Sequence, residues 1–300
     1  SRSSVSTMVL EEDKCWDPIK LIQFWHNFSS AAAMTHAKWP ATLITKLIRA
    51  KALVILRIEL AARSADVTSL SWALISPRVP IKLTATARRQ ISVQLYNTKP
   101  DKIKKNFGKL TPAKFLYETK GSNACVVKTL NELYSTTPFE NVDTRDEFDP
   151  IFVSEKVSKD KAGKRRFKGL SSQRLSNIVR LSYIGAQIKS LLSKHIRSMA
   201  SSKVDIVGIP EKVFLSHFQW SSMQTFKKYY KKKFLSNPPE VTGASFSDAL
   251  HAVLEYPDPA VQCVAMRANV ERLLAVTAAN TNFSTIASNR SFSANDVQNI

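Results

Sequence analysis

The stretch "TLITKLIRAKALVILRIEL", residues 42–60, has apolar side chains at helical spacing, and towards its end the helix is apolar on nearly every side. A helix that is apolar all round lies inside a domain, because a surface helix keeps one polar face. The stretch therefore predicts a long buried helix. The chain has seven glycines against thirteen prolines, so we expect further helices and few tight turns.

The segments on either side of this helix predict a mainly α fold with a small antiparallel β-sheet. Alternating β-branched residues at 80–97 predict two short strands, whereas the many charges of 154–169 predict a loop. Apolar periodicity predicts further helices at 16–27, 123–135, 171–188, 189–205, 210–216, 222–235, 245–255 and 259–279. We expect three regions along the chain: an N-terminal tail at 1–15, one domain at 16–235 and a helical C-terminal extension at 236–300.

The charge of the chain indicates a polyanionic partner. The formal net charge is +20 at pH 7, and residues 236–300 contain no lysine, so residues 1–235 carry the excess of cations. Nucleic acid is the commonest polyanion that such a surface attracts, and a basic surface without a specific partner is the alternative. No run of eighteen apolar residues occurs, and we expect neither a membrane span nor an export signal.

The motifs of several enzyme classes are absent from the sequence. It has no GxxxxGK[ST] or GxGxxG, no HExxH, no GxSxG and no CxxC pair, and its three cysteines lie far apart. A nucleotide hydrolase, a zinc enzyme and an α/β-hydrolase therefore have no support. We expect no metal and no cofactor.

What remains is a set of cations and a hydroxyl, which is sufficient for phosphate chemistry. Guanidinium groups stabilise the charge of a phosphoryl transition state, and a tyrosine hydroxyl can be the nucleophile. The candidates in chain order are Arg63 with Asp66, Lys99, Lys194, His195, Arg197, Trp220, and the pair Tyr229 and Tyr230. Taken singly, Arg63 and Asp66 can form a structural salt bridge, and Lys99 can lie in a solvated turn.

Together these residues resemble the catalytic set of the tyrosine recombinase (phage integrase) family. That set is an Arg in an R-x-x-[DE] helix end, a Lys in a β-hairpin, [HK]-x-x-R, a His or Trp, and a Tyr nine or ten residues beyond. Three stretches look most similar to the recombinases of DIRS-like retroelements and Cryptons: "WDPIKLIQFW" from 16, "LYNTK" from 95, and the segment from 195 that ends in "WSSMQTFKKYYKK". The resemblance covers roughly 16–235 and implies the catalytic-domain fold of that family.

The resemblance also implies an activity, namely cleavage and rejoining of duplex DNA without metal or ATP, as in the integration of a mobile element. The roles that it implies are phosphate binding by Arg63 and Arg197, assistance by Lys194 or His195, protonation of the leaving oxygen by Lys99, support of the nucleophile by Trp220, and structural support by Asp66. The DIRS-like pattern favours Tyr230 as nucleophile, and the spacing of other branches favours Tyr229. Many members have His where Lys194 stands, and which of Lys194 and His195 faces the phosphate is open.

We expect double-stranded DNA to be the partner, contacted by lysines and arginines of three basic stretches. These are Lys102, Lys104 and Lys105, then Lys164, Arg165 and Arg166, and finally Lys227, Lys228 and Lys231. Residues 259–279 carry an apolar stripe at helical spacing. The resemblance implies that this segment bridges the protomers of a homo-oligomer on DNA, and folding back onto its own domain is the alternative. In a eukaryotic host we expect the nucleus, and otherwise the cytoplasm with the chromosome.

Two other function classes stay open. One is a recombinase-derived DNA-binding protein that no longer cuts, favoured by Lys194 in the histidine position and by the lack of room before Trp16 for the DNA-clamping domain of the family. The other is a relaxing enzyme similar to type IB topoisomerases, which uses the same kind of residue set.

Overall fold

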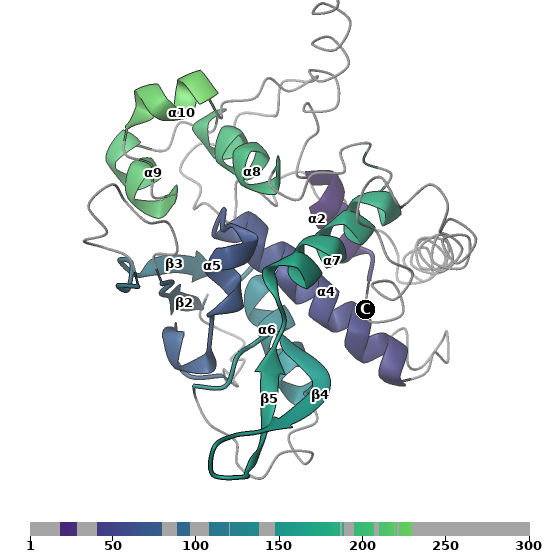
Figure 1. The fold of residues 1–300 in the computed structure, drawn as a ribbon. Coiled ribbons are helices and arrows are strands. Elements are labelled where there is room, and N and C mark those ends of the chain that lie inside the picture. Colours follow the sequence, from purple (N-terminus) through teal and green to yellow (C-terminus); the bar gives the residue numbers. More distant parts are fainter. Residues whose placement is uncertain are drawn as a thin grey trace, which may run out of the picture.

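The computed structural model describes residues 19–28, 41–79, 89–96, 108–119, 121–137, 148–186, 188, 195–206, 210–218, 220 and 222–229. In this part the chain forms helices with two small antiparallel sheets (Figure 1). The mainly helical character agrees with the sequence prediction, which expected one such sheet. The helices are α2 (Ile19–His26), α4 (Ala41–Glu59), α5 (Ser64–Thr68), η1 (Trp72–Leu74), α6 (Val126–Thr136), α7 (Ser172–Gly185), α8 (His195–Ile206), α9 (Glu211–Phe218) and α10 (Met223–Tyr229). The strands are β1 (Ile75–Ser76), β2 (Gln90–Val93), β3 (Lys114–Tyr117), β4 (Val153–Lys159) and β5 (Arg165–Gly169).

Helix α4 is the centre of the fold. Every residue from Leu47 to Glu59 is buried, charged residues included, which confirms the buried helix predicted at 42–60. Helices α2, α6, α7 and α8 all pack against it. The core of the described residues is one continuous apolar cluster built on this helix, apart from a small separate group on β4 and β5.

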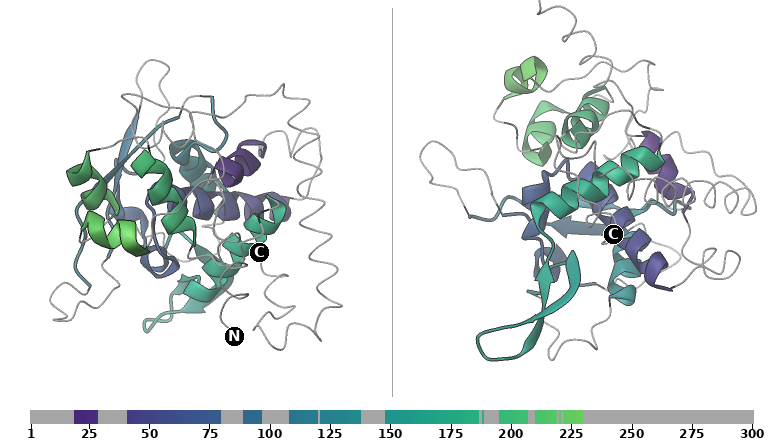
Figure 2. Two further views of the ribbon diagram at one scale, coloured as in Figure 1. Left: turned by 90° about the horizontal axis from the view of Figure 1, so that it is seen from above. Right: turned by 45° about the vertical axis from the view of Figure 1, so that its right-hand side comes forward.

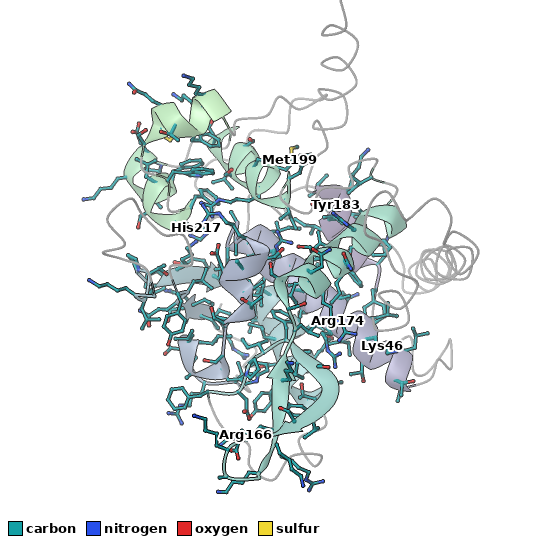
Figure 3. All side chains as sticks on the ribbon, viewed as in Figure 1. Lys46, Arg166, Arg174, Tyr183, Met199 and His217 are labelled. Carbon is teal, nitrogen blue, oxygen red and sulfur yellow. The ribbon has the colours of Figure 1, made fainter. Side chains whose placement is uncertain are left out.

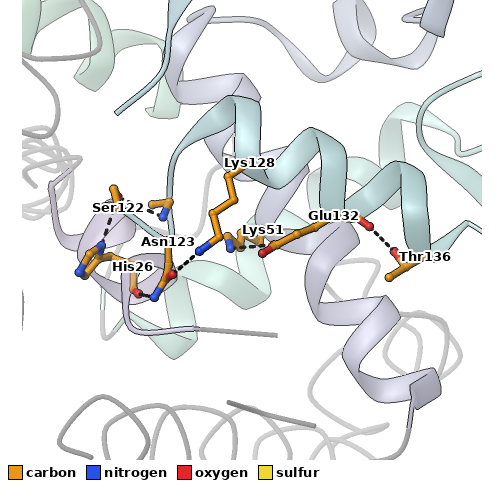
Figure 4. Close-up of polar contacts among 8 residues, drawn as sticks. His26, Lys51, Ser122, Asn123, Lys128, Glu132 and Thr136 are labelled. Atoms are coloured by element: carbon orange, nitrogen blue, oxygen red, sulfur yellow. Dashed lines mark hydrogen bonds and ion pairs between the residues drawn. The ribbon is translucent and has the colours of Figure 1, made fainter. Parts of the chain in front are cut away.

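Polar contacts attach α6 to the central helix, and α2 to the segment that precedes α6 (Figure 4). The ammonium of Lys51, a fully buried residue of α4, donates to the carboxylate of Glu132 on α6 at 3.1 Å. Nδ1 of His26 and Oγ of Ser122 lie 3.2 Å apart, and the Asn123 side chain donates to the backbone oxygen of His26 at 3.1 Å. A buried charge is tolerated where an opposite charge meets it, and Lys51 meets this condition.

The larger sheet has the strand order β1-β2-β3, and both pairings are antiparallel. Only β2 falls within 80–97, where two strands were predicted; residues 80–88 lie outside the described part, and β1 and β3 lie on either side of the predicted range. The prediction of a loop at 154–169 was wrong. Strands β4 and β5 pair there as an antiparallel hairpin, which projects from the helical body (Figure 1).

Helices α8, α9 and α10 lie together on one side of the molecule (Figure 2). Helix α8 packs on both α4 and α9. The ring of Phe214 on α9 lies 4.8 Å from the ring of Phe226 on α10, and both residues are buried. This aromatic contact fixes α10 to α9 and thereby places the end of α10 relative to the core.

Candidate active site

The chain turn at the end of α4 places Arg63. Ala61 has a left-handed backbone conformation (φ 43°), which reverses the chain between α4 and α5. Arg63 precedes the first residue of α5, and its backbone N–H donates to Oδ2 of Asp66 at 2.8 Å. The R-x-x-D spacing thus has a local explanation, because the carboxylate binds the backbone at the start of a short helix and fixes its position.

The same carboxylate of Asp66 connects this turn to α8. Its Oδ2 lies 4.0 Å from Nη1 of Arg197, and both side chains are buried. Arg197 also donates through Nη2 to the backbone oxygen of Phe218 at 2.6 Å, and its guanidinium carbon lies 4.6 Å from the ring centre of Trp220. An opposite charge, a carbonyl and an indole face each stabilise a buried guanidinium. Arg197 is therefore held rigidly at the meeting point of α5, α8 and α9.

The structure thus brings together four residues that the sequence predicted to share a site. Arg63, Asp66, Arg197 and Trp220 come from three separate segments of the chain and converge at the end of α4. Arg63 is half-buried, whereas the other three are buried. His195 is buried in the first turn of α8, two residues before Arg197.

Other predicted site residues cannot be placed, because they lie outside the described residues: Lys99, Lys194 and Tyr230, with Lys102, Lys104, Lys105 and Lys231 of the basic stretches. Tyr229 is the last residue of α10, and its side chain is likewise outside the described part.

Helix α10 begins at a serine cap and carries cations on its outer side. Oγ of Ser222 accepts the backbone N–H of Thr225 at 3.1 Å, as expected for a helix start. Phe226 is fully buried and lies 5.9 Å from the ring of Trp220, so the first member of the predicted aromatic stripe belongs to the core. Lys227 and Lys228 are exposed. Helix α10 therefore packs beside Trp220, which stacks on Arg197, and its two lysines are directed to solvent.

Lys114 is a site residue that the sequence analysis missed. It is the first residue of β3, is 3% exposed, and donates through Nζ to the backbone oxygen of Leu60 at 3.0 Å. It interacts electrostatically with Arg63, Asp66 and Arg197. Burial, and after it the positive charge of Arg197, lowers the pKa of Lys114 to about 7.

His217 is the second residue that the sequence analysis missed. It lies near the end of α9, on the side that faces the body of the molecule (Figure 3), and its Nε2 lies 2.8 Å from the backbone oxygen of Glu59. Burial lowers the pKa of His217 to about 4, and the charge of Lys114 acts in the same direction. The ring is therefore neutral near pH 7, and Nε2–H donates to the carbonyl.

The β4–β5 hairpin contains one of the predicted basic stretches. Lys164 and Arg165 are exposed, at and just after the turn between the strands. Arg166 is only partly exposed, and its Nε lies 3.2 Å from Oδ2 of Asp160 (Arg166 is labelled in Figure 3). Asp160 also accepts the backbone N–H of Lys164 at 3.0 Å. Arg166 thus supports the turn, while Lys164 and Arg165 face solvent.

Within the described ranges, no group of three or more His, Cys, Asp or Glu side chains is arranged to hold a metal ion. No helix of the described part has both the length and the apolar character that a membrane crossing requires. No family model and no curated protein matches this chain. The function is therefore proposed on the geometry of the site itself.

Proposed function

We propose that this chain is a tyrosine recombinase that cleaves and rejoins duplex DNA through a covalent 3′-phosphotyrosine. The observation that carries the proposal is the junction at Asp66. There Oδ2 of Asp66 lies 4.0 Å from the guanidinium of Arg197, which is stacked on Trp220, and also accepts the backbone N–H of Arg63, so that two arginines from distant segments meet at one carboxylate. Two guanidiniums can bind both non-bridging oxygens of one phosphodiester and stabilise the charge that develops on them.

The proposed reaction exchanges one phosphoester bond for another. The phenolic oxygen of Tyr230 forms a bond to phosphorus while the bond from phosphorus to the 5′-oxygen breaks. The phenolic proton passes to a neighbouring base, for which His195 is the candidate, and Lys99 donates a proton to the leaving 5′-oxygen. Because the phosphotyrosine keeps the energy of the broken ester, a 5′-hydroxyl can reverse the reaction without ATP.

A DNA-binding protein without cleavage activity is the second candidate, and one observation favours it. Arg197 is 5% exposed, and its guanidinium already contacts Asp66, the backbone oxygen of Phe218 and the ring of Trp220. An arginine held in this way can be a structural element of the core. On this alternative, DNA binds to the basic surface and no covalent intermediate forms.

A suicide substrate distinguishes the two candidates. The substrate is a pool of random-sequence duplexes with a nick a few nucleotides 3′ of the labelled segment, so that the freed 5′-hydroxyl fragment diffuses away after cleavage. We expect an adduct that survives denaturing electrophoresis. Mass spectrometry of the tryptic peptide between Lys228 and Lys231 should find the nucleotide on Tyr230. A nucleotide on Tyr229 identifies the other tyrosine as nucleophile, and the absence of any adduct supports the DNA-binding protein.

Substitution of the arginines tests the site itself. Arg63→Ala and Arg197→Ala should each reduce adduct formation by about two to three orders of magnitude, because each removes donors to the transition state. Duplex affinity should stay near wild type, since each arginine contacts one phosphate among many. Arg78→Ala, which changes an exposed arginine, is the matched control and should form the adduct at the normal rate. Equal rates in all three variants would contradict the proposal.

A further inference from the structure

The two buried lysines of the described part differ in what surrounds their charge. Lys51 has the carboxylate of Glu132 at 3.1 Å and lies over the ring of Phe28. Lys114 has the carbonyl of Leu60 at 3.0 Å, and within the described residues no carboxylate lies at ion-pair distance from its Nζ. An ammonium that is removed from water without a counter-ion is costly, so this site favours either a neutral amine or an anion from outside.

The charged groups that interact with Lys114 include more cations than carboxylates. They are Arg63 and Asp66 from the α5 segment, Arg197 from α8, and the titratable ring of His217 from α9. Asp66 is the acidic member of this set, and its Oδ2 already accepts the backbone N–H of Arg63 and pairs with Arg197. The cluster therefore has an excess of cations in a buried place, and an anion with several oxygens can satisfy them together.

We propose that Lys114 is the third cation of the phosphate site and that it takes up one proton from solvent when a DNA phosphodiester binds beside it. The inference rests on the proposed function, because it takes the anion to be a phosphodiester of duplex DNA. No covalent bond changes in this step: a neutral amine gains a proton from the buffer, and the resulting ammonium is stabilised by the phosphate oxygen. Lys114 acts here as a phosphate-binding residue, distinct from the leaving-group acid assigned to Lys99.

The protonation of Lys114 without DNA sets the direction of the proton movement. With its pKa lowered to about 7, the amine of Lys114 is mostly neutral at pH 8 in the absence of DNA. A bound anion favours the charged form and raises the pKa, so binding and protonation are linked. We therefore expect DNA binding at pH 8 to consume about one proton per site, and the affinity to decrease as the pH rises above about 7.

Calorimetry in two buffers of different ionisation enthalpy measures this uptake. The full chain carries Tyr229→Phe and Tyr230→Phe to prevent cleavage, and it is titrated with a short intact duplex at pH 8. In this background we expect an uptake of about one proton. Lys114→Met should remove it because no titrating group remains, and Lys114→Arg should remove it because guanidinium stays charged throughout. Lys109→Met, which changes an exposed lysine shortly before β3, should keep it.

Folding is followed by thermal unfolding, and Lys114→Gln provides a second neutral variant if the methionine variant fails to fold. No proton uptake by the background protein, or unchanged uptake in Lys114→Met or Lys114→Gln, overturns the inference. Uptake that depends on Lys114, together with no covalent adduct in the suicide assay, leaves the inference standing and rejects cleavage. A covalent adduct together with proton uptake that does not depend on Lys114 supports cleavage and rejects the inference about Lys114. Failure to bind duplex at all rejects both.

Discussion

The carbonyl groups at the end of α4 and in the turn after it show how single residues control the position of Arg63. The final carbonyls of a helix have no partner within it, and here three side chains contact the backbone at this end. Arg57 donates to Ala62 O at 3.2 Å, Lys114 donates to Leu60 O, and His217 donates to Glu59 O. The turn before Arg63 is therefore held by side chains from α4, β3 and α9. A change in β3 or α9 can act on the site through these carbonyls.

The lowered pKa of His217 predicts that the folded protein loses stability in mild acid. Its pKa is about 4 in the folded protein and about 6.5 in the unfolded chain, so below pH 6.5 the unfolded chain binds the proton first. The contribution of neutral His217 to the free energy of unfolding is fully present above pH 6.5 and is lost as the pH falls towards 4. At pH 5 we expect the wild type to have lost about 2 kcal/mol of unfolding free energy through this group. Denaturant unfolding at pH 7 and pH 5 measures the loss.

Two variants of His217 separate titration from hydrogen bonding. His217→Gln keeps an N–H donor but cannot titrate, so its unfolding free energy should change less between the two pH values than that of the wild type. His217→Ala also removes the donor and should be destabilised at both, because the buried carbonyl of Glu59 loses its side-chain partner. If all three proteins lose the same stability on acidification, His217 is not the group responsible.

At the scale of elements, the sequence predicted the long helices because their apolar periodicity has no competing interpretation. The expected ranges 42–60 and 171–188 correspond to α4 and α7 within a few residues. The R-x-x-D and K-x-x-R spacings likewise indicated Arg63 and Arg197, since a buried arginine needs a partner that sequence can suggest. Patterns of this kind depend on neighbours along one helix, and a sequence shows them directly.

The strands were harder to predict, for two physical reasons. In β3, Lys114 is buried while Phe115 is 50% exposed, which is the reverse of what polarity predicts for "KFLY". The lysine at the first position of this strand was the signal that the sequence offered. Only the fold shows that its amine donates to the backbone oxygen of Leu60 and interacts electrostatically with Arg63 and Arg197. In the β4–β5 hairpin, residues 158–165 are exposed apart from the half-buried Asp160, and Val153, Val157 and Phe167 form its small apolar cluster. A ribbon of this kind has too little alternation to be told from a charged loop.

If the chain binds duplex DNA as proposed, we expect the β4–β5 hairpin to make a measurable share of the DNA contacts. Lys164 and Arg165 are exposed on a ribbon that projects from the body, and a two-stranded ribbon fits the major groove. Lys164→Ala with Arg165→Ala should reduce the slope of log affinity against log salt by about two, one for each lost phosphate contact. Fluorescence anisotropy with a labelled duplex at several salt concentrations measures this slope.

The control for the hairpin removes the same charge from elsewhere. Arg78→Ala with Lys212→Ala changes two exposed cations outside the hairpin, and its slope should stay near that of the wild type. The same decrease in both double variants means that net charge acts without a defined contact, which excludes the hairpin as a specific DNA arm.

At the scale of the whole molecule, two elements with exposed cations, α10 and the β4–β5 hairpin, lie on either side of the region that holds Arg63 and Arg197. In Figure 1 and the right-hand view of Figure 2, α10 and the β4–β5 hairpin are at opposite ends of the described body, and α5 lies between them. Exposed cations are present at both ends, with Lys227 and Lys228 on α10. On the proposed function, a duplex that contacts both ends passes Arg63 and Arg197. The ends would then supply the affinity for DNA, and the two arginines would select one phosphate.

The proposed division of roles predicts a steep salt dependence of DNA affinity that the site variants change only slightly. A protein that contacts about six to ten phosphates releases their counter-ions, and its affinity falls by about three to five powers of ten between 50 and 200 mM salt. The net charge of +20 is sufficient for contacts of this number. Arg63→Ala should lower the slope by no more than about one while it removes the covalent adduct. Fluorescence anisotropy measures the slope. The control is a duplex with uncharged methylphosphonate linkages, which should bind weakly at every salt concentration. An affinity that is flat across this range, or equal for the uncharged duplex, would mean that the basic surface does not bind the DNA backbone.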